Sequence, residues 1–568
     1  LLWHPLIMEK ITALIDKIYA DAFPQAMRER LLATIVEARD TTKLPRKAHW
    51  DEQDVVLITY ADQFREPGKP TLNTFSRFYQ QHLHATFPLV HLLPFYPYSS
   101  DDGFSVINYH QVDPLCGDWQ DIALLHQETR LMFDFVCNHM SAHSAWFKHY
   151  LAQDEGWDDF FISLPPTTDL SAVTRPRTSP LLTPFTLENG EIRFVWTTFS
   201  ADQIDLNFAR PRVLVRMVEV LLDYLKRGAD YVRLDAVGYM WKTPGTNCIH
   251  LEKTHLLVKL FRAIADVVAP GTVIITETNV PHKDNISYFG NGQDEAQMVY
   301  QFSLPPLVLH AIHTGSARAL RQWASTLQVG NGDTTFFNFL ASHDGIGLNP
   351  ARGILSEVEI TALVRDLALE GALISYKNNP DGSTSPYEIN VTYFDALNRE
   401  GDDDETRLKR FMLAHAILLA FPGVPAVYIQ SILGSRNDYD GVREAGHNRA
   451  INRQKYSLSA IEDALVNSDG LRHQVYTRLS KLIQQRRRQT AFHPDNPLTL
   501  FQSDNALLIM KRYSHNGGDE LLCVFNLSGR QIEARLPEAH LFQDVVSGEK
   551  IDGTQPVTLD AWQFMWLR

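Results

Sequence analysis

Residues 230–239, DYVRLDAVGY, combine the pattern of a buried strand with two charged side chains. Side chains alternate between the two faces of a strand, so Arg233 and Asp235 share one face and their apolar neighbours point to the other. An unpaired buried carboxylate is costly, so a charge in such a place has a partner, a ligand or a reaction. The segment alone leaves two interpretations open: a structural ion pair, or a functional carboxylate with its cation.

Similar apolar runs recur up to about residue 435, and amphipathic helical patterns separate them. Near-continuous apolar strands that alternate with helices are typical of a parallel sheet covered by helices on both faces. Eight strand–helix units predict an α/β fold, a (β/α)8 TIM barrel, with its active site at the C-terminal ends of the strands. The predicted strands are VVLITYAD (55–62), VHLLPFYP (90–97), RLMFDFVCNH (130–139), YVRLDAVG (231–238), TVIITETN (272–279), MVYQFS (298–303), TTFFNFLASHD (334–344) and AVYIQSILG (426–434).

Two gaps between the predicted strands are too long for simple loops and predict inserted subdomains at the barrel mouth. After about residue 490 short apolar runs replace the strand–helix alternation and predict a C-terminal β-sandwich. The expected organisation is a catalytic barrel over 1–139 (with an N-terminal helical extension), 206–344 and 405–490, an inserted subdomain over 140–205, a second insertion with acceptor loops over 345–404, and the sandwich over 491–568.

The composition is that of a globular enzyme, with 44% hydrophobic and 21% charged residues in a chain of 568. The formal net charge of −14 disfavours a nucleic-acid partner, because phosphate backbones require a basic face. A small anionic substrate needs only a local cationic pocket and remains compatible with this charge.

The four cysteines are far apart, which fits a reducing cytoplasm and offers neither a disulfide framework nor a zinc site. The first residues, LLWHPLIMEK, lack the basic region of a signal peptide, which also favours a cytoplasmic location. Residues 413–435 carry no Asp, Glu, Lys or Arg and are long enough to span a bilayer. PGVP at 422–425 interrupts them, however, so we expect a buried helix ending near Phe421, then a turn and a strand, and no membrane partner.

Polar residues follow four of the predicted strands, in DFVCNH (Asp134, Asn138, His139), VRLDAVG (Arg233, Asp235), ITETN (Glu277) and ASHDG (His343, Asp344). In this order and placement they resemble the four signature regions of glycoside hydrolase family 13, the α-amylase family, and the resemblance covers essentially the whole chain. It implies that Asp235 is the nucleophile, Glu277 the general acid/base and Asp344 the carboxylate that stabilises the transition state. Retaining transfer needs two carboxylates about 5 Å apart that titrate differently, and Arg233 supplies the cation that keeps one of them ionised.

The same resemblance implies a donor-glucose site at the closed end of the pocket. Asp101 and Arg449 would clamp the glucose and bridge across this end, which excludes longer glucans. Phe104 would form a platform for the ring, and His139 and His343 would bind its hydroxyls. Asp134 and Asn138 are expected to be structural. Calcium is common in the family but not in this subgroup, so we expect neither a metal nor a cofactor.

Within the family the chain is most similar to the sucrose phosphorylase group. The matching segments are ITYADQ (58–63), HLLPFYPYSSDDGF (91–104), NHMSAHS (138–144), RPR (175–177), RLDAVGY (233–239), PPLVLHA (305–311), HDGIG (343–347), FPGVPAVYI (421–429) and NRAINR (448–453). Phosphate replaces water as the attacking group in a phosphorylase, which requires cationic and hydroxyl donors near the anomeric carbon. Arg177, Tyr239 and Tyr387 match positions that serve phosphate in this group, and Arg175 is either a further phosphate ligand or a solvated residue.

Glu388 stands where sucrose phosphorylases carry glutamine, and the preceding loop, KNNPDGSTSP, also differs from theirs. The whole-chain likeness is to the glucosylglycerate phosphorylases, which implies small-molecule partners only: an α-glucoside, inorganic phosphate, α-D-glucose 1-phosphate and D-glycerate. The glycerate carboxylate requires a cation, with Arg175, Arg177, Lys377 and Arg436 as candidates, and Glu388 would bind acceptor hydroxyls. The alternatives are a phosphorylase for sucrose, sucrose 6′-phosphate or glucosylglycerol, a hydrolase or transglucosidase of the same family, and a non-catalytic transporter subunit, which the intact carboxylates disfavour.

Overall fold

A closed barrel of parallel strands forms the centre of the molecule, as the sequence predicts. The computed structural model describes residues 4–47, 49–328 and 332–568. Each strand is short and fully buried or nearly so, which explains the near-continuous apolar runs. The barrel strands are β1 (Val56–Thr59), β3 (Leu89–Leu92), β4 (Arg130–Phe135), β9 (Tyr231–Leu234), β10 (Val273–Thr276), β11 (Met298–Tyr300), β12 (Thr335–Asn338) and β16 (Val424–Tyr428).

The last barrel strand differs from its prediction at both ends. It begins at Val424 rather than after the PGVP turn, and it contains Pro425, which pairs with Asn338 of β12. It ends at Tyr428, and the next residues form a short helix, α14 (Ile429–Ile432), where the sequence predicts continued strand. β-branched residues favour strands only weakly, and tertiary context overrides that preference here.

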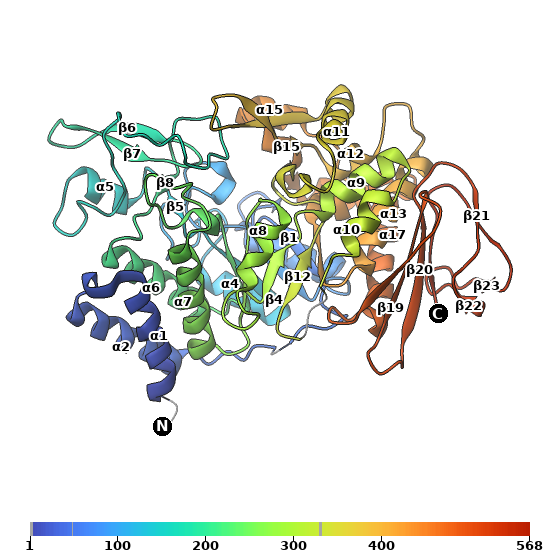
Figure 1. The fold of residues 1–568 in the computed structure, drawn as a ribbon, viewed down its shortest axis with the longest axis horizontal. Coiled ribbons are helices and arrows are strands. Elements are labelled where there is room, and N and C mark those ends of the chain that lie inside the picture. The colour runs from blue at the N-terminus through green and yellow to red at the C-terminus, as the bar shows by residue number, and fades with distance from the viewer. Residues whose placement is uncertain (1–3, 48, 329–331) are drawn as a thin grey trace.

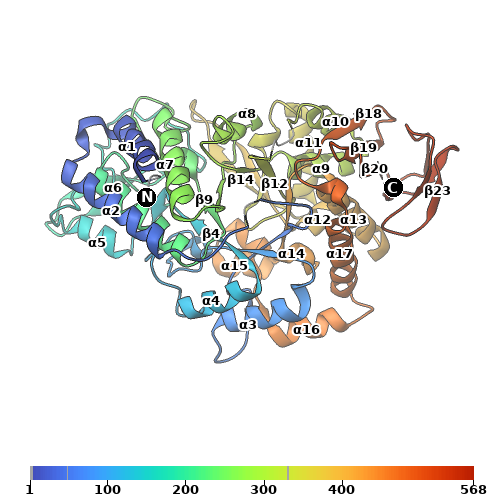
Figure 2. The ribbon, with the colours of Figure 1, turned by 90° about the horizontal axis from the view of Figure 1, so that it is seen from below.

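Amphipathic helices cover the outside of the barrel (Figures 1 and 2). The N-terminal helices, α1 and α2, pack against α7, and α2 also contacts α6, on the side of the barrel opposite to the C-terminal strands. The helix expected to end near Phe421 is α13, which ends at Ala420. Among the described residues, no helix has both the length and the apolar character that crossing a bilayer requires. The larger helices are α1 (His4–Tyr19), α2 (Gln25–Thr41), α3 (Thr71–Phe78), α4 (Trp119–Glu128), α6 (Pro211–Lys226), α7 (Glu252–Val268), α9 (Leu304–Thr314), α10 (Arg318–Ala324), α13 (Asp404–Ala420), α16 (Leu458–Val466) and α17 (Leu471–Arg487).

Two excursions from the barrel lie along one edge of the molecule, the upper edge in Figure 1. The first contains a β-hairpin and returns to the barrel through a short strand that pairs with β5. The second contains a three-stranded sheet in the order β13-β15-β14, flanked by α11 and α12. Their elements are β5 (His139–Met140), α5 (Ala145–Leu151), β6 (Leu182–Thr186), β7 (Ile192–Trp196) and β8 (Ile204–Asp205), then β13 (Ile346–Gly347), α11 (Glu357–Leu369), β14 (Leu373–Asn378), β15 (Thr384–Asn390) and α12 (Tyr393–Leu397).

The C-terminal region is all β, as predicted, and packs on the outer helices of the barrel. Its main sheet is antiparallel in the order β18-β19-β20-β25, with smaller pairs β21-β24 and β22-β23 beside it. Arg512 on β19 is fully buried and donates to the backbone oxygen of Ala420, which ties this sheet to the end of α13. The strands are β18 (Leu498–Phe501), β19 (Leu507–Tyr513), β20 (Glu520–Asn526), β21 (Ile532–Ala534), β22 (Leu541–Gln543), β23 (Lys550–Asp552), β24 (Val557–Leu559) and β25 (Phe564–Leu567).

Candidate active site

Two carboxylates lie at the C-terminal ends of adjacent barrel strands and share one guanidinium. Asp235 follows the last residue of β9, and Glu277 follows the last residue of β10. Arg233 Nη1 donates to Asp235 Oδ1 at 2.8 Å, and its Nη2 lies 3.8 Å from Glu277 Oε2. Arg233 is 1% exposed, so these interactions act in a medium that screens them weakly. The charged pair in DYVRLDAVGY therefore belongs to a cluster that includes a second carboxylate.

Arg233 is itself held in place from behind by buried polar groups. Its Nη1 also donates to Asp134 Oδ1 at 2.6 Å, and its Nε donates to the Tyr300 hydroxyl at 2.9 Å. The other oxygen of Asp134 lies 2.7 Å from His91 Nε2. Asp134 is fully buried and does not line the cavity, so it supports the arginine from the barrel interior.

The residue after Asp235, Ala236, has a strained backbone conformation that places its N–H against Glu277. Ala236 has a φ of 52°, a left-handed conformation that costs a non-glycine residue about 1–2 kcal/mol. In this conformation the Ala236 N–H donates to Glu277 Oε2 at 3.1 Å. Strain of this kind concentrates at functional sites, where the surrounding structure enforces it.

Proton affinities differ among the three candidate catalytic carboxyls. Burial raises the pKa of Asp235 to about 7 and that of Glu277 to about 7, and Arg233 opposes the shift in both. Burial and the repulsion between the two carboxylates keep one proton on the pair near neutral pH. Because Arg233 is closer to Asp235, that proton is favoured on Glu277. Burial acts in the same direction on Asp344, but Arg449 and other cations hold the pKa of that carboxyl well below its usual range.

Arg449 holds two carboxylates at once on the opposite side of the site. Its Nη1 donates to Asp344 Oδ1 at 2.7 Å, and its Nε and Nη2 donate to the two oxygens of Glu388 at 2.8 and 3.0 Å. Glu388 is 2% exposed and does not line the cavity. The structure therefore differs from the expected contact between Glu388 and acceptor hydroxyls, since both oxygens of this carboxylate bind Arg449.

Asp101 is paired with a residue that the sequence interpretation did not assign. The predicted bridge from Asp101 to Arg449 is absent from the ion pairs of the described residues; Arg453 Nη1 instead lies 3.1 Å from Asp101 Oδ1. Arg453 also donates to Asp102 and to the backbone oxygen of His343. The segment NRAINR contains both arginines, but no pattern in it distinguishes their partners.

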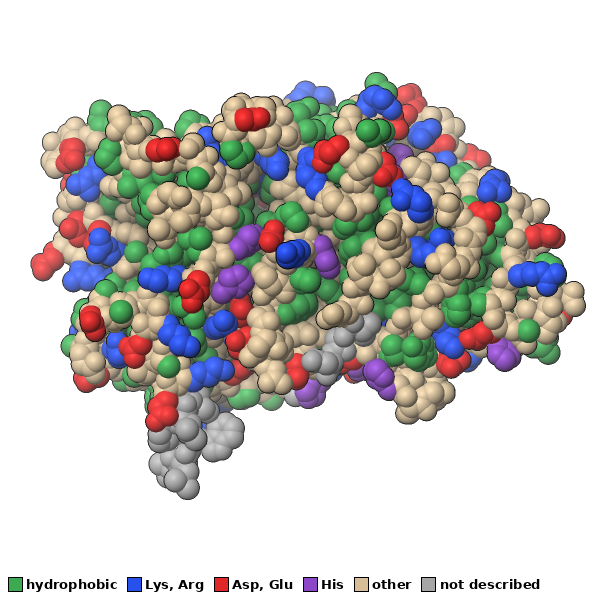
Figure 3. Space-filling model, viewed as in Figure 1, with side chains coloured by type: hydrophobic (Ala, Val, Ile, Leu, Met, Phe, Trp, Pro, Cys, Tyr) green, Lys and Arg blue, Asp and Glu red, His purple; other side chains and the backbone are tan. Residues whose placement is uncertain are grey.

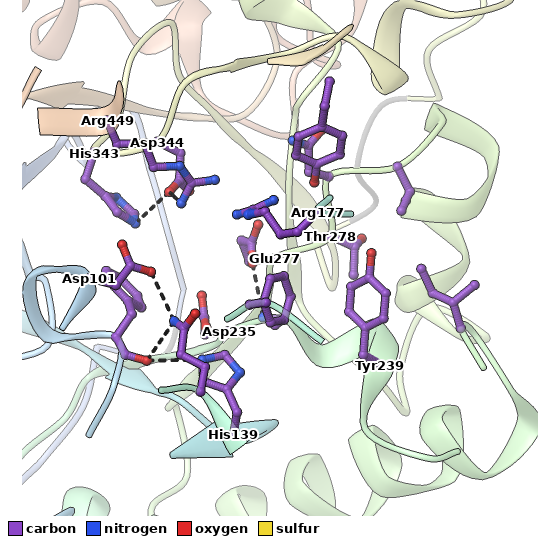
Figure 4. Close-up of a pocket in the computed structure, with 18 residues that line it drawn as sticks. Asp101, His139, Arg177, Asp235, Tyr239, Glu277, Thr278, His343, Asp344 and Arg449 are labelled. Carbon is purple, nitrogen blue, oxygen red and sulfur yellow. Dashed lines mark hydrogen bonds and ion pairs between the residues drawn. The ribbon is translucent and has the colours of Figure 1, made fainter. Parts of the chain in front are cut away.

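The predicted sugar-binding side chains gather around one cavity (Figure 4). Phe104 stacks on His343, with ring centroids 4.7 Å apart and planes 4° from parallel. Burial lowers the pKa of His139 to about 4 and that of His343 to about 3, so both imidazoles are neutral and offer hydrogen bonds without charge. Phe199 and Gln203 of the first excursion also line the cavity and were missed, because an irregular segment gives no periodic signal.

Arg177 reaches the cavity from the first excursion and lies between two aromatic rings. Its guanidinium carbon is 5.4 Å from the ring centroids of Phe199 and of Tyr387. Its hydrogen bond goes to the backbone oxygen of Pro176, and it forms no ion pair within the described part of the chain. In Figure 4 Arg177 and Tyr239 lie on one side of Asp235 and Glu277, and Asp101, His343 and Asp344 lie on the other.

The other candidate cations lie outside the cavity. Arg175 donates to the backbone oxygen of Ser179, and Lys377 donates to Asn349 Oδ1. Arg436 forms an ion pair with Asp395. Of the four cations that the sequence offered for an acceptor carboxylate, the structure places Arg177 alone at the cavity.

A buried lysine occupies the junction between the barrel and the first excursion. Lys242 Nζ lies 2.8 Å from Asp205 Oδ2 and 2.9 Å from Asn138 Oδ1, and the Lys242 side chain is 2% exposed. Thr198 also donates to Asp205 through its backbone N–H and its hydroxyl. In the part of the chain that the structure describes, no group of His, Cys, Asp and Glu has the arrangement of a metal site.

Known proteins resemble this chain over its full length. The chain is 58% identical to the "Glucosylglycerate phosphorylase" of Escherichia coli (strain K12), over 99% of this chain and 100% of that protein. The chain belongs to the α-amylase family. Residues 80–346 match the family described as "Alpha amylase, catalytic domain". The expected resemblance to glycoside hydrolase family 13 is thereby confirmed.

Other members of the α-amylase family are similar over most of the chain. The "Glucosylglycerate phosphorylase" of Allomeiothermus silvanus is 46% identical, over 91% of this chain and 92% of that protein. The crystal structure of sucrose 6F-phosphate phosphorylase from Thermoanaerobacter thermosaccharolyticum superposes with a TM-score of 0.73 at 25% identity, covering 90% of this chain and 99% of that chain.

Proposed function

We propose that this chain is a retaining glycoside phosphorylase that interconverts 2-O-(α-D-glucosyl)-D-glycerate and phosphate with α-D-glucose 1-phosphate and D-glycerate. The observation that carries the proposal is the full-length likeness, at 58% identity, to a glucosylglycerate phosphorylase. The uncommitted guanidinium of Arg177 beside the candidate catalytic carboxylates supports it, because both phosphate and D-glycerate are anions.

In the first half-reaction Asp235 attacks the anomeric carbon, and Glu277 donates its proton to the departing glyceryl oxygen. The bond from carbon to that oxygen breaks as the bond to Asp235 Oδ forms, which leaves a glucosyl-enzyme and D-glycerate. The raised pKa of Glu277, which burial brings to about 7, keeps a proton available for this step near neutral pH. Asp344, with its pKa held low, stays anionic and stabilises positive charge at the anomeric centre.

In the second half-reaction phosphate takes the place of D-glycerate. A phosphate oxygen attacks the anomeric carbon, Asp235 departs as a carboxylate, and a proton from the phosphate returns to Glu277. Two inversions give α-D-glucose 1-phosphate with the starting configuration. Arg177 holds phosphate in this step and the glycerate carboxylate in the other. Tyr239 lies on the same side of the cavity (Figure 4), and the ring of Tyr387, which also lines the cavity, packs against the Arg177 guanidinium.

Donor recognition is assigned to the opposite side of the cavity. Asp101, Phe104, His139, His343 and Arg449 surround the glucose, and Arg453 keeps Asp101 ionised and oriented. Glu388 acts through Arg449, which it holds against Asp344. We also assign the protein to the cytoplasm, since its four buried cysteines are all unpaired.

An acceptor panel tests the proposal. The protein is incubated with α-D-glucose 1-phosphate and one of D-glycerate, glycerol, fructose, fructose 6-phosphate or water, and phosphate release is measured. D-glycerate should exceed fructose and glycerol by at least tenfold in kcat/KM, because a neutral acceptor leaves Arg177 without an anion. Glycerol is the matched control, since it keeps the hydroxyls and lacks the carboxylate. Equal rates with glycerol and D-glycerate would refute the glucosylglycerate assignment, and the absence of any acceptor-dependent phosphate release would refute a phosphorylase.

A further inference from the structure

A second pocket lies between the end of α9, the start of α13 and the C-terminal sheet. Its volume is about 560 Å³, within the range of small-molecule sites, and none of the residues that line it also lines the candidate active site. The side chains that carry the argument are Thr314 of α9, Arg399 before α13, Arg410 of α13, and Ser528, Arg530 and Trp562 of the C-terminal region.

Three arginines line this pocket, and its described lining contains no carboxylate. Arg410 lies 4.3 Å above the Trp562 ring and is paired with Asp402. Arg530 has its nearest carboxylate oxygen 3.8 Å away, on Asp504, and the Arg399 side chain forms no ion pair with any described residue. The chain as a whole carries a formal charge of −14, and Figure 3 shows acidic and basic side chains interspersed over one face. Arg399, which has no ion-pair partner among the described residues, and Arg530, whose carboxylate partner is 3.8 Å away, leave this pocket with positive charge that attracts anions.

Trp562 supplies an aromatic wall to this pocket. Its Nε1 is buried and has no hydrogen-bond partner among the described residues. The benzene-ring edge of the indole, at Cζ2 and Cη2, lies against Gly529, which is part of the pocket wall. Trp562 also has a φ of 53°, so the chain holds this ring in place at the expense of backbone strain.

Two hydroxyl groups complete the lining as hydrogen-bond acceptors. Thr314 Oγ1 donates to the backbone oxygen of His310, and Ser528 Oγ donates to Asn526 Oδ1. Since each hydroxyl has used its proton, its oxygen is left to accept from a ligand. Guanidinium groups suit phosphate, and acceptor oxygens suit the hydroxyls of a polyol.

We propose that this pocket binds a phosphorylated polyol and, through α12, adjusts the acceptor side of the active site. His313, which also lines the pocket, has its Nε2 2.7 Å from the backbone oxygen of Ala396 in α12. Two residues join α12 to β15, the strand that carries Tyr387 and Glu388. A ligand that fixes α9 against α12 thereby restrains β15. This second, regulatory part rests on the proposed function, whereas the binding part does not.

Calorimetric titration with sorbitol 6-phosphate tests the binding part, with sorbitol as the neutral comparison and inorganic phosphate as the comparison without a polyol. The double variant R399Q/R530Q removes two exposed guanidinium groups that the active site does not use. We expect it to bind sorbitol 6-phosphate at least tenfold more weakly than the wild type. The control variant R365Q/R443Q makes the same change of charge at two exposed arginines outside the pocket, and should bind as the wild type does.

The binding part would be overturned if R399Q/R530Q and the wild type bound sorbitol 6-phosphate with equal affinity, or if sorbitol bound as tightly as sorbitol 6-phosphate. It would also be overturned if inorganic phosphate alone bound more tightly at this site, or if R177Q rather than R399Q/R530Q lost the binding of sorbitol 6-phosphate. The regulatory part is tested by the KM for D-glycerate, which saturating sorbitol 6-phosphate should change at least twofold in the wild type and leave unchanged in R399Q/R530Q. An unchanged KM in the wild type would overturn that part. If D-glycerate is not an acceptor at all, the proposed function fails while the calorimetric result still decides the pocket.

Discussion

Replacement of Arg177 with glutamine tests whether one guanidinium serves both anions of the reaction. Arg177 is held by Phe199 and Tyr387 and forms no ion pair with a carboxylate in the described structure. Its removal therefore leaves no buried charge without a partner, and the free energy of unfolding should change little. Any large effect on turnover is then an effect on anion binding.

The size of the effect follows from the strength of hydrogen bonds to charged groups. Such a bond contributes about 1.5–3 kcal/mol, and about 1.4 kcal/mol corresponds to a factor of ten. We expect kcat/KM to fall by roughly tenfold to a hundredfold for phosphate and by a similar factor for D-glycerate. Hydrolysis of α-D-glucosyl fluoride uses water as the acceptor and should change less than threefold.

The assay compares initial rates of phosphorolysis, glucosylglycerate synthesis and fluoride hydrolysis in the wild type, Arg177→Gln and Arg175→Gln. Arg175 lies in the same RPR segment but bonds the backbone of Ser179 outside the cavity, so its variant should resemble the wild type. Equal losses in all three reactions would show that Arg177 supports the fold of the site rather than an anion. A loss with phosphate but not with D-glycerate would refute the shared guanidinium.

The remaining predictions concern the candidate catalytic carboxyls and the buried lysine. Asp235→Asn should abolish turnover with every glucosyl donor, measured by product formation, because no glucosyl-enzyme forms. Glu277→Gln should be far slower with glucosylglycerate than with α-D-glucosyl fluoride, whose leaving group needs little protonation. Since burial raises the pKa of Glu277 to about 7, its proton is present below that pH and lost above it, so glucosylglycerate cleavage should fall as pH rises through about 7. Lys242→Met leaves the buried carboxylate of Asp205 without its ion-pair partner and should lower the free energy of unfolding, measured by urea titration, by about 3–5 kcal/mol. An unchanged urea midpoint would show that this ion pair does not stabilise the fold.

The barrel and its carboxylates could be predicted because both leave a local trace in the sequence. A parallel strand buried on both faces is a short apolar run, and a polar residue at the end of such a run lies at the barrel mouth. Asp235, Glu277 and Asp344 each follow a run of this kind, and the structure lines one cavity with all three. The order of the strands follows from the regular alternation with helices.

The partners of Arg449 and Arg453 left no such trace, because each of these pairs joins residues far apart in the chain. Glu388 and Arg449 are separated by 61 positions, and Arg453 and Asp101 by 352. Three residues separate Arg453 from Arg449 in NRAINR, so either side chain was compatible with either carboxylate until the backbone was placed. The short helix after β16 was missed for a related reason: its apolar residues suit a strand locally, and only packing decides.

Most arginines at or beside the candidate active site are already paired with carboxylates, which bears on where an anionic substrate can bind. Arg233, Arg449 and Arg453 each bind at least two carboxylates, which satisfies them before any substrate arrives. A glutamine in place of Glu388 would leave Arg449 with Asp344 as its one partner and with unused donors beside the donor glucose. An entering phosphate or glycerate would then find a second cation on the wrong side of the anomeric carbon. By occupying Arg449, Glu388 leaves Arg177 as the uncommitted cation among the described residues of the cavity. We propose that Glu388 thereby directs anions to the acceptor side without contacting them.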